Sequence, residues 1–363
     1  MSMNVIDLFC GCGGFSHGFS RAGFNVVLGV DMWSDAVTTY LANHPQSKAI
    51  NGDITEITPE EVLAECGLDS SDIDVIIGGP PCQGFSISGK RMIDDPRNRL
   101  YKSFVEMVAT IKPKMFVMEN VPGLLSMGKG AIKEQILEDF NNAGYNVVTK
   151  VLTASDYGVP QARKRVFFIG INPEKIHNTA EFAFPEATHG DAFFQLPFVT
   201  CEDALSDLDF ISETEMLPET TEYVLPPQTE YQKKMRENSA MLTNHVTTIH
   251  TQKTRDIIAM VPDGENYKSL PRELWETRKV HIAWTRMNSQ KPSFTIDTGH
   301  NHHFHYRANR VPTVRESARL QSFPDTFQFL GIKTSQLKQV GNAVPPILAE
   351  VIATEVKKTI ERG

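Results

Sequence analysis

The chain has 363 residues, of which 40% are hydrophobic, so it is long enough for one large domain with a smaller one, or for two domains. Its apolar runs are too short to cross a membrane, and its N-terminus lacks a secretory pattern, so we expect no membrane association. Five cysteines are few and odd in number, which favours a cytoplasmic protein with free thiols over a disulfide scaffold. The net charge of −8 by itself disfavours a nucleic-acid binder.

Short apolar segments alternate with helical patterns over residues 1–175. This alternation predicts an α/β fold with a doubly wound, mostly parallel sheet. The expected strands are Val5–Phe9, Val26–Val30, Val75–Ile77, Met115–Met118 and Val166–Ile169, and the clearest helices are Ser34–Asn43 and Leu100–Ile111.

A glycine-rich turn follows the first expected strand, in the order Cys10-Gly11-Cys12-Gly13-Gly14-Phe15-Ser16. Such a turn at the start of a helix lets a ligand lie against backbone N–H groups. Asp31, at the end of the second strand, is placed to accept bonds from ribose hydroxyls. The pattern predicts a nucleoside-containing cofactor, and a dinucleotide fits it nearly as well. Asp7 disfavours a pyrophosphate, because its carboxylate suits a cationic group. Cys10 and Cys12 lack a second ligand pair, so we expect no metal site.

The run from Gly78 to Ser86 places Cys82 on a turn directly after a buried strand. Open α/β sheets hold their chemistry at the carboxyl ends of strands, and Pro80 and Pro81 stiffen the backbone before the thiol. The spacing favours a nucleophilic cysteine over an inert turn residue.

Two further strand-associated motifs carry charged side chains. Glu119 ends the strand at Met115–Met118, where it is either a proton donor near Cys82 or a cap or salt-bridge partner. Arg163 and Arg165 alternate on an extended segment and should face the same way. Paired guanidinium groups suit phosphate or a carboxylate cluster, and the alternative is a charged edge strand.

Charge is unevenly distributed over the rest of the chain. Residues 176–230 hold twelve acidic residues and no Lys or Arg, whereas residues 231–320 hold fifteen basic and eight acidic residues. The basic stretch is either a phosphate-facing surface or a solvated face. The basic segment after Cys82 is either a loop that closes over a polyanion or an ordinary charged loop. The histidine-rich run 299–305 lacks an acidic partner and helical spacing, which disfavours metal binding.

The motifs occur in a fixed order that closely resembles the DNA (cytosine-5)-methyltransferase family of prokaryotic restriction–modification systems. The resemblance covers residues 3–170 and 312–360, whereas residues 176–300 match no motif. Besides the glycine-rich turn, it rests on Pro80-Pro81-Cys82-Gln83, Glu119-Asn120-Val121, Gln161-x-Arg163-x-Arg165, Arg315-Glu316-x-Ala318-Arg319-Leu320-Gln321-x-Phe323-Pro324 and Gln339-Val340-Gly341-Asn342-Ala343-Val344-Pro345-Pro346.

The resemblance implies an S-adenosylmethionine-dependent methyltransferase fold with a smaller target-recognition domain. It implies a catalytic and cofactor-binding domain at 1–175, a recognition domain with an acidic connector at 176–310, and a C-terminal segment at 311–363 that returns to the catalytic domain. Asp31 stands where the family commonly has Glu, which leaves its contact less certain. The implied cofactor-binding residues are Phe9, Gly11, Gly14, Phe15, Asp31, Asp53, Ile54, Pro80, Asn98, Leu100, Asn342 and Val344.

The resemblance also implies the catalytic roles. Cys82 would attack C6 of a flipped cytosine, Glu119 would bond N3, and Arg163, with Arg165, would hold the base or its phosphate. Related amino-group methyltransferases carry an aromatic residue after Pro-Pro, and the cysteine here favours methylation of the ring carbon. Candidate DNA-binding residues are Gln83, Ser86, Lys90, Arg91, Arg97, Thr285 and Arg286.

The leading hypothesis is therefore sequence-specific C5 methylation of duplex DNA by a monomer that is paired in function with a restriction endonuclease. The alternatives are a tRNA cytosine-5 methyltransferase and a nucleic-acid-binding protein without catalysis. The long unmatched region favours DNA, because a target reader needs its own surface.

Overall fold

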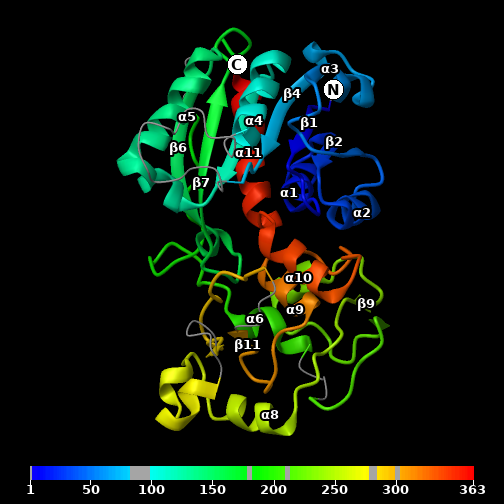
Figure 1. Ribbon diagram of the computed structural model, residues 1–363, viewed down its shortest axis with the longest axis vertical. Helices are drawn as coiled ribbons and strands as arrows, with labels where there is room; N and C mark the ends of the chain where they lie inside the picture. Colours follow the sequence, from blue (N-terminus) through cyan, green and yellow to red (C-terminus); the bar gives the residue numbers. More distant parts are fainter. Residues whose placement is uncertain (1, 82–98, 178–181, 209–212, 278–283, 299–302) are drawn as a thin grey trace. The chain divides into compact units, whose positions relative to one another are not determined.

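The computed structural model describes residues 2–81, 99–177, 182–208, 213–277, 284–298 and 303–363 (Figure 1). The chain forms two compact units. Unit 1 comprises residues 1–153, 164–186 and 346–363, and unit 2 comprises residues 154–163 and 187–345. The C-terminal segment expected as one piece, 311–363, is thus divided: only residues from Pro346 onward lie in unit 1, with the expected cofactor domain.

Unit 1 is built on a seven-stranded sheet with the order β3-β2-β1-β4-β5-β7-β6. The first five strands in this order run parallel, whereas β7 is antiparallel to both β5 and β6. This confirms the predicted doubly wound, mostly parallel α/β sheet. The strands are β1 (Asn4–Leu8), β2 (Asn25–Asp31), β3 (Lys48–Asn51), β4 (Ile73–Gly78), β5 (Met115–Asn120), β6 (Asn146–Thr153) and β7 (Lys164–Ile171).

Helices cover both faces of this sheet. Helices α3 (Pro59–Cys66), α4 (Arg99–Ile111) and α5 (Ala131–Asn142) bury apolar side chains against one face. Helices α1 (Gly14–Arg21) and α11 (Pro346–Arg362) pack on each other (Figure 1). Further helical segments of unit 1 are α2 (Ser34–Asn43), η1 (Ser70–Asp72) and η4 (Pro122–Gly130).

The contact between α1 and α11 is close because Gly18 lacks a side chain. A β-carbon at Gly18 would lie 2.3 Å from Ala349 Cβ and 2.6 Å from the backbone nitrogen of Glu350. The last helix of the chain thereby supports the helix that follows the glycine-rich turn. The sequence positions of these two helices differ by more than 300 residues, so no local pattern predicts their contact.

Unit 2 contains short helices and two-stranded pairings, in which β8 and β9 run antiparallel and β10 and β11 run parallel. Its strands are β8 (Thr220–Thr221), β9 (Leu242–Thr243), β10 (Thr285–Arg286) and β11 (His303–Phe304). Its helical segments are η5 (Ala154–Tyr157), α6 (Cys201–Leu205), η6 (Ser206–Leu208), α7 (Glu230–Met235), α8 (Gln252–Ala259), η7 (Tyr267–Ser269), η8 (Arg272–Thr277), α9 (Val314–Leu320) and α10 (Lys333–Asn342).

The interior of unit 2 holds charged side chains from α9. Arg319 is fully buried and forms a two-pronged pair with Asp325, with 2.7 Å for both the Nε–Oδ1 and the Nη2–Oδ2 distances. Its Nη1 also donates to Asp207 Oδ1 at 2.9 Å. Arg310 pairs with Glu316 in the same manner, at 2.6 and 2.7 Å. The Arg-Glu-x-Ala-Arg motif therefore contributes to the interior of this unit, where Arg310, Glu316 and Arg319 are each paired with an opposite charge.

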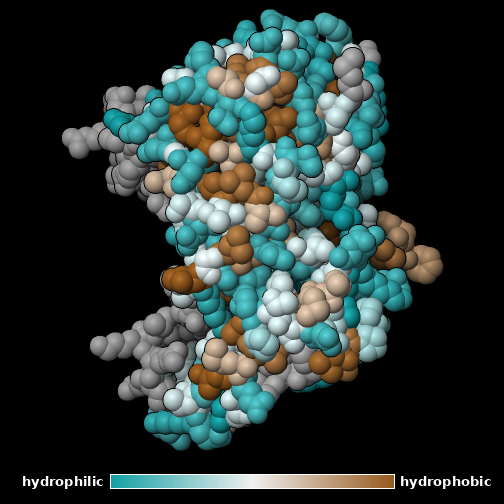
Figure 2. All heavy atoms as spheres, turned by 90° about the vertical axis from the view of Figure 1, so that its right-hand side faces the viewer, coloured by the Kyte–Doolittle hydropathy of each residue, from teal (hydrophilic) through white to brown (hydrophobic). Residues whose placement is uncertain are grey.

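The surface is hydrophilic over most of the face shown in Figure 2, with hydrophobic residues in small separate groups. Within the part of the chain that the structure describes, no helix is long and apolar enough to cross a lipid bilayer.

Candidate functional site

The glycine-rich turn connects β1 to α1 and is shaped by residues with positive φ. Phe9 has φ of 63°, and Gly13, which caps α1, has φ of 97°. A β-carbon at Gly13 would lie 2.4 Å from His44 Nε2, so the turn packs against α2 and its end only with glycine there. These conformations set the turn in one shape.

Asp31, at the end of β2, holds this turn. Its Oδ2 accepts the Gly11 backbone N–H at 2.8 Å, and its Oδ1 accepts the Trp33 N–H at 2.9 Å. Burial raises the pKa of Asp31 above its usual range, although these backbone donors oppose the shift. Asp31 is thus brought to the glycine turn, as the ribose hypothesis requires. The role of the residue is also structural, which the sequence did not indicate.

Asp7 lies beneath the turn on β1 and is 1% exposed. Ser16 donates to its Oδ2 at 2.6 Å, and the chain of polar groups continues from Ser16 to Tyr40 and from Tyr40 to Ser47. Its Oδ1 is buried and has no hydrogen-bond partner among the residues that the structure describes. Burial raises the pKa of the Asp7 carboxyl to about 7. A buried carboxylate oxygen without a partner fits a cationic ligand better than an anionic one.

We expect Asp7→Asn to make the stability of the ligand-free protein less sensitive to a rise in pH from about 5 to about 7. The folded protein keeps the Asp7 proton up to about pH 7, whereas the unfolded chain, with a pKa near 3.8, releases it earlier. The wild type therefore loses stability as the pH rises through this range, and asparagine cannot titrate. The free-energy advantage of the variant should grow by about 2–3 kcal/mol between pH 5 and pH 8, since each pKa unit corresponds to about 1.4 kcal/mol.

Denaturant unfolding at several pH values measures this effect. The exposed Glu138 on α5 provides the control, because Glu138→Gln is a surface substitution and should change stability little. Parallel pH profiles for Asp7→Asn and the wild type would contradict the raised pKa.

The carboxyl ends of β4 and β5 meet beside the segment that leads to Cys82. Asn120 Nδ2 donates to the Pro80 carbonyl at 2.9 Å, which ties the end of β5 to the turn after β4. A β-carbon at Gly79 would lie 3.0 Å from Glu119 Oε2. The Glu119 carboxylate therefore lies next to the backbone three residues before Cys82. Asn120 belongs to a motif that the sequence identified, but its tethering role was missed because no local pattern reveals the partner.

Arg165 and Glu119 form an ion pair, with 2.7 Å between Nε and Oε1 and side-chain exposures of 14% and 12%. The antiparallel register of β5 and β7 sets Glu119 opposite Phe167, so Arg165, two residues away, lies on the same face. The structure thus unites two of the predicted catalytic residues. Arg163 is 1% exposed and belongs to unit 2.

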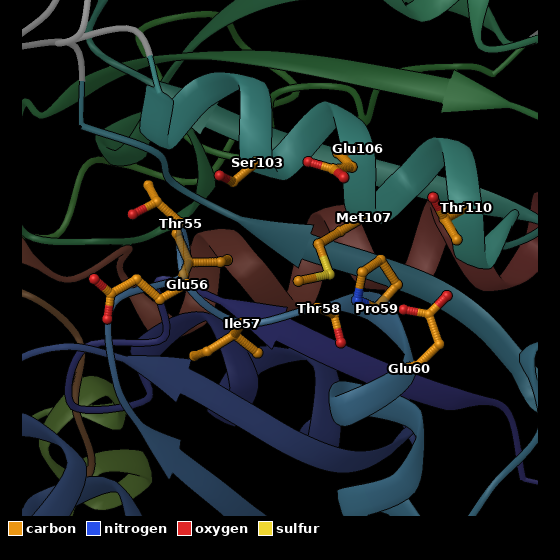
Figure 3. A pocket seen from close by; sticks show the side chains of 11 residues that line it. Thr55, Glu56, Ile57, Thr58, Pro59, Glu60, Ser103, Glu106, Met107 and Thr110 are labelled. Carbon is orange, nitrogen blue, oxygen red and sulfur yellow. The ribbon is translucent and has the colours of Figure 1, made fainter.

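Asp53 and Ile54 follow β3, where Asp53 Oδ1 accepts bonds from the backbone N–H and the hydroxyl of Thr55, both at 2.9 Å. Ile54 lines a cavity of about 260 Å³ between this segment and α4. Figure 3 shows Thr55 and Ile57 on one side and Ser103 and Met107 of α4 on the other. The cavity rim carries Glu56, Glu60 and Glu106. Of the expected cofactor residues only Ile54 lines this cavity, so it is not the space above the glycine turn.

Other expected cofactor residues differ in accessibility. Phe15 is 3% exposed and packs edge-on against Phe19 and Phe167, so most of its ring is already covered by protein. Pro80 is buried, and Leu100 is half-buried against the core. Asn342 is exposed at the end of α10, and Val344 is 7% exposed; both belong to unit 2.

Several expected site residues lie outside the described residues, so the structure does not locate them. They are Cys82, Gln83, Ser86, Lys90, Arg91, Arg97 and Asn98.

Arg286, expected to contact DNA, is instead used inside unit 2. It is 5% exposed, and its guanidinium donates to five backbone carbonyls and to Asn309 Oδ1. The bonds to Ile258 and Val261, at 2.6 and 2.7 Å, anchor it to the end of α8 and the residues beyond. Since its donors already have acceptors, we no longer assign Arg286 to base readout. Thr285 is half-buried in β10 and remains a candidate.

Within the ranges that the structure describes, no three or more His, Cys, Asp or Glu side chains gather as ligands for one metal ion. His305, from the histidine-rich run, is fully buried, and its Nδ1 accepts the backbone N–H groups of Arg307 and Ala308. Burial lowers its pKa to about 3, so the ring stays neutral and acts as an acceptor that shapes this turn.

Comparison with known proteins adds family information to this geometry. Residues 3–358 match the family described as C-5 cytosine-specific DNA methylase. The type II methyltransferase M.DdeI of Desulfomicrobium norvegicum is 40% identical, over 98% of this chain and 88% of that protein. The type II methyltransferase M1.HphI of Haemophilus parahaemolyticus is 38% identical, over 99% of this chain and 87% of its own length.

Solved structures share the fold. A prophage-encoded E. coli protein described as a DNA modification methyltransferase superposes with a TM-score of 0.80 and 30% identity, over 99% of this chain and all of the other. DNMT2 of Spodoptera frugiperda gives a TM-score of 0.63 at 18% identity, over 99% of this chain and 100% of that one, which supports the fold alone.

Proposed function

This chain belongs to the C-5 cytosine-specific DNA methylase family and is a DNA cytosine-5 methyltransferase of the type II restriction–modification kind, and from this premise we propose its target and mechanism. It methylates one cytosine within a specific sequence of duplex DNA, with S-adenosylmethionine as the methyl donor and Cys82 as the covalent nucleophile. The observation that carries this proposal is the Glu119–Arg165 pair at the strand ends beside Gly79.

The residues around the glycine turn fit the methyl donor. The turn presents backbone N–H groups at the start of α1, Asp31 offers carboxylate oxygens, and Asp7 Oδ1 is a buried acceptor without a partner. Exposed Met32, next to Asp31, adds an apolar surface that the sequence analysis did not single out. These residues would hold a ligand that combines a ribose with a cationic group. When bound, S-adenosylmethionine supplies an electrophilic methyl group.

The chain's own residues make C5 of cytosine reactive. The Cys82 thiolate adds to C6, and the electron pair of the C5–C6 bond moves toward C5 and the ring nitrogen N3. Glu119 hydrogen-bonds N3 and supplies a proton there, which stabilises the ring as the sulfur adds. After C5 has taken the methyl group, the Glu119 carboxylate takes its proton back from N3. A base then removes the C5 proton, the C5–C6 double bond re-forms, and the Cys82 sulfur leaves C6 with its electron pair.

Arg165 shapes the role of Glu119. Its Nε holds Oε1 of the carboxylate, while Oε2, on the side of Gly79, is left to face the base. Arg163 would contact the flipped cytosine or its phosphate, and the basic residues after Cys82 would contact the DNA backbone and offset part of the cost of flipping.

The biological role follows from the relatives. Proteins named type II methyltransferases match nearly the whole chain. We therefore propose that it acts as a monomer on host DNA in the cytoplasm and protects that DNA from a cognate restriction endonuclease.

A methylation assay followed by bisulfite sequencing tests the proposal. Unmethylated plasmid DNA is incubated with the protein and with S-adenosylmethionine labelled in its methyl group. We expect label at C5 of cytosines within one sequence context, which the sequencing identifies. Label in tRNA alone would support the tRNA alternative, and label in neither nucleic acid would contradict the proposal.

A further inference from the structure

Gln161 belongs to the Gln-x-Arg-x-Arg motif, but the proposed chemistry uses only the two arginines. Its side chain is fully buried in unit 2. Its Oε1 accepts the Ile296 backbone N–H at 3.1 Å, and its Nε2 donates to the Leu320 carbonyl at 3.2 Å and to Gln321 Oε1. One amide thus joins two segments that are more than 130 residues away along the chain.

The backbone on either side of Gln161 strengthens this junction. Ala162 N–H donates to the Ser293 carbonyl at 2.7 Å, and Ser293 N–H donates to the Pro160 carbonyl at 2.9 Å. Residues 160–162 therefore pair in parallel with residue 293. Ser293 lies within the basic stretch 231–320, in the part of the chain where we expect target recognition, and Arg163 comes directly after Ala162.

Gln321 extends the junction to the C-terminal motif. Its Nε2 donates to the Ala343 carbonyl at 2.6 Å, and Ala343 stands between the expected cofactor residues Asn342 and Val344. The C-terminal motif also packs closely against the segment 293–297, because a β-carbon at Gly341 would lie 2.1 Å from the Asp297 carbonyl oxygen. Four segments of unit 2 therefore meet around the two glutamines: 160–163, 293–297, 320–321 and 341–343.

We propose that the Gln161–Gln321 pair is a positioning device that couples the recognition segment at 293–297 to Arg163 and to the C-terminal cofactor motif. When the protein binds a DNA sequence other than its target, displacement of the recognition segment would disturb the hydrogen bond between Ile296 and Gln161. The backbone that carries Arg163 would then shift. The pair would thus contribute to sequence discrimination without contacting a base. This role rests on the proposed function of Arg163 in holding the flipped cytosine.

A purely structural role is the competing explanation, since any buried amide with three bonds supports a fold. The chain offers a matched control in Gln232, which is also fully buried in unit 2. Gln232 Nε2 donates to the Asp203 carbonyl and Ser206 Oγ at 2.9 and 2.8 Å, and its Oε1 accepts the Gln228 N–H. It makes three bonds of the same kind and touches none of the four segments.

The experiment compares Gln161→Ala, Gln161→Glu and Gln232→Ala with the wild type, at temperatures chosen below all measured Tm values. Turnover is measured at saturating plasmid DNA, KM is measured for S-adenosylmethionine, and bisulfite sequencing scores methylation outside the main context. Gln161→Glu keeps the volume and the acceptor for the Ile296 N–H but replaces the Nε2 donor with a carboxylate oxygen, so it serves as a second variant if the alanine variant does not fold.

We expect both Gln161 variants to lower turnover by about 10–100-fold, as displaced positioning residues do, with KM for the methyl donor within about threefold of the wild-type value. The ratio of off-context to main-context methylation should rise by about tenfold. Gln232→Ala should leave turnover and the methylated sequence context unchanged, even if it lowers Tm by as much as Gln161→Ala does.

The positioning role would be overturned if the Gln161 variants kept the wild-type turnover and the wild-type sequence context of methylation. It would also be overturned if Gln161→Ala and Gln232→Ala lowered turnover and context selectivity equally. These results leave the proposed function standing. An absence of C5 methylation by the wild type would instead overturn the proposed function, and the positioning role with it.

Discussion

We expect Cys82→Ala to abolish methylation of DNA, with turnover reduced by about 10⁴-fold or more. C5 of cytosine is a poor nucleophile until a sulfur atom adds at C6, and alanine leaves no group on this turn that can form that bond. Binding of duplex DNA should survive, because the thiol contributes little to phosphate contacts. Filter binding or fluorescence anisotropy on plasmid-derived duplexes measures binding, and methyl incorporation measures turnover.

Cys66, on α3, provides the control for this substitution. Cys66→Ala removes a half-buried thiol that no proposed step uses, so turnover should stay at the wild-type level. Duplexes that contain 5-fluorocytosine in the methylated context should trap the wild type and Cys66→Ala as covalent adducts, because the fluorine at C5 blocks release of the sulfur. A covalent adduct with Cys82→Ala would contradict the nucleophile assignment. So would a Cys82→Ala variant that binds DNA weakly but methylates the DNA it has bound at the wild-type rate.

Glu119→Gln should reduce turnover by about 10²–10⁴-fold, the usual range for loss of a general acid. The amide has the same shape and can still donate a hydrogen bond to N3, but it cannot transfer a proton to the ring. It also removes the charge that pairs with Arg165 at 2.7 Å. Formation of the adduct with 5-fluorocytosine DNA should slow in parallel with turnover, because the defect lies in the addition step.

The Arg165→Met variant distinguishes loss of the ion pair from loss of the proton donor. This variant breaks the pair while Glu119 remains, and its turnover should exceed that of Glu119→Gln. Glu106→Gln, at the rim of the α4 cavity, is the charge-matched control and should retain turnover. If Glu119→Gln methylates DNA at the wild-type rate, Glu119 is a structural partner of Arg165 and no proton donor.

The strands of the sheet show where sequence patterns suffice. Val5–Phe9 and Met115–Met118 were predicted within two residues of the observed β1 and β5, because each is a mostly apolar run that is buried on both faces. Strand β6 was missed, since most of its residues are partly exposed and its polar and apolar residues do not alternate clearly. Strand β3 is only four residues long, which is too short for a periodic signal.

Burial of charge was the largest departure from the sequence-based expectation. Arg315, Glu316 and Arg319 are fully buried in α9, and Arg286 is 5% exposed. A helical pattern with charged residues is typical of a solvated face, so the sequence predicts exposure for such residues. Burial becomes favourable only because Arg319 has acidic partners, of which Asp325 is six residues away and Asp207 is 112 residues away along the chain.

The sequence by itself determined the sheet type, the turn after β1, and the position of Glu119 at a strand end. These features depend on local periodicity, on glycine conformation and on the rule that parallel strands share one carboxyl edge. Only the tertiary structure decided that Glu119 pairs with Arg165, that Arg286 serves the fold, and that Gln161 and Gln321 together join four segments. The reason is physical: which donor meets which acceptor depends on the register of strands and on contacts between residues far apart in the chain, and no local pattern encodes them.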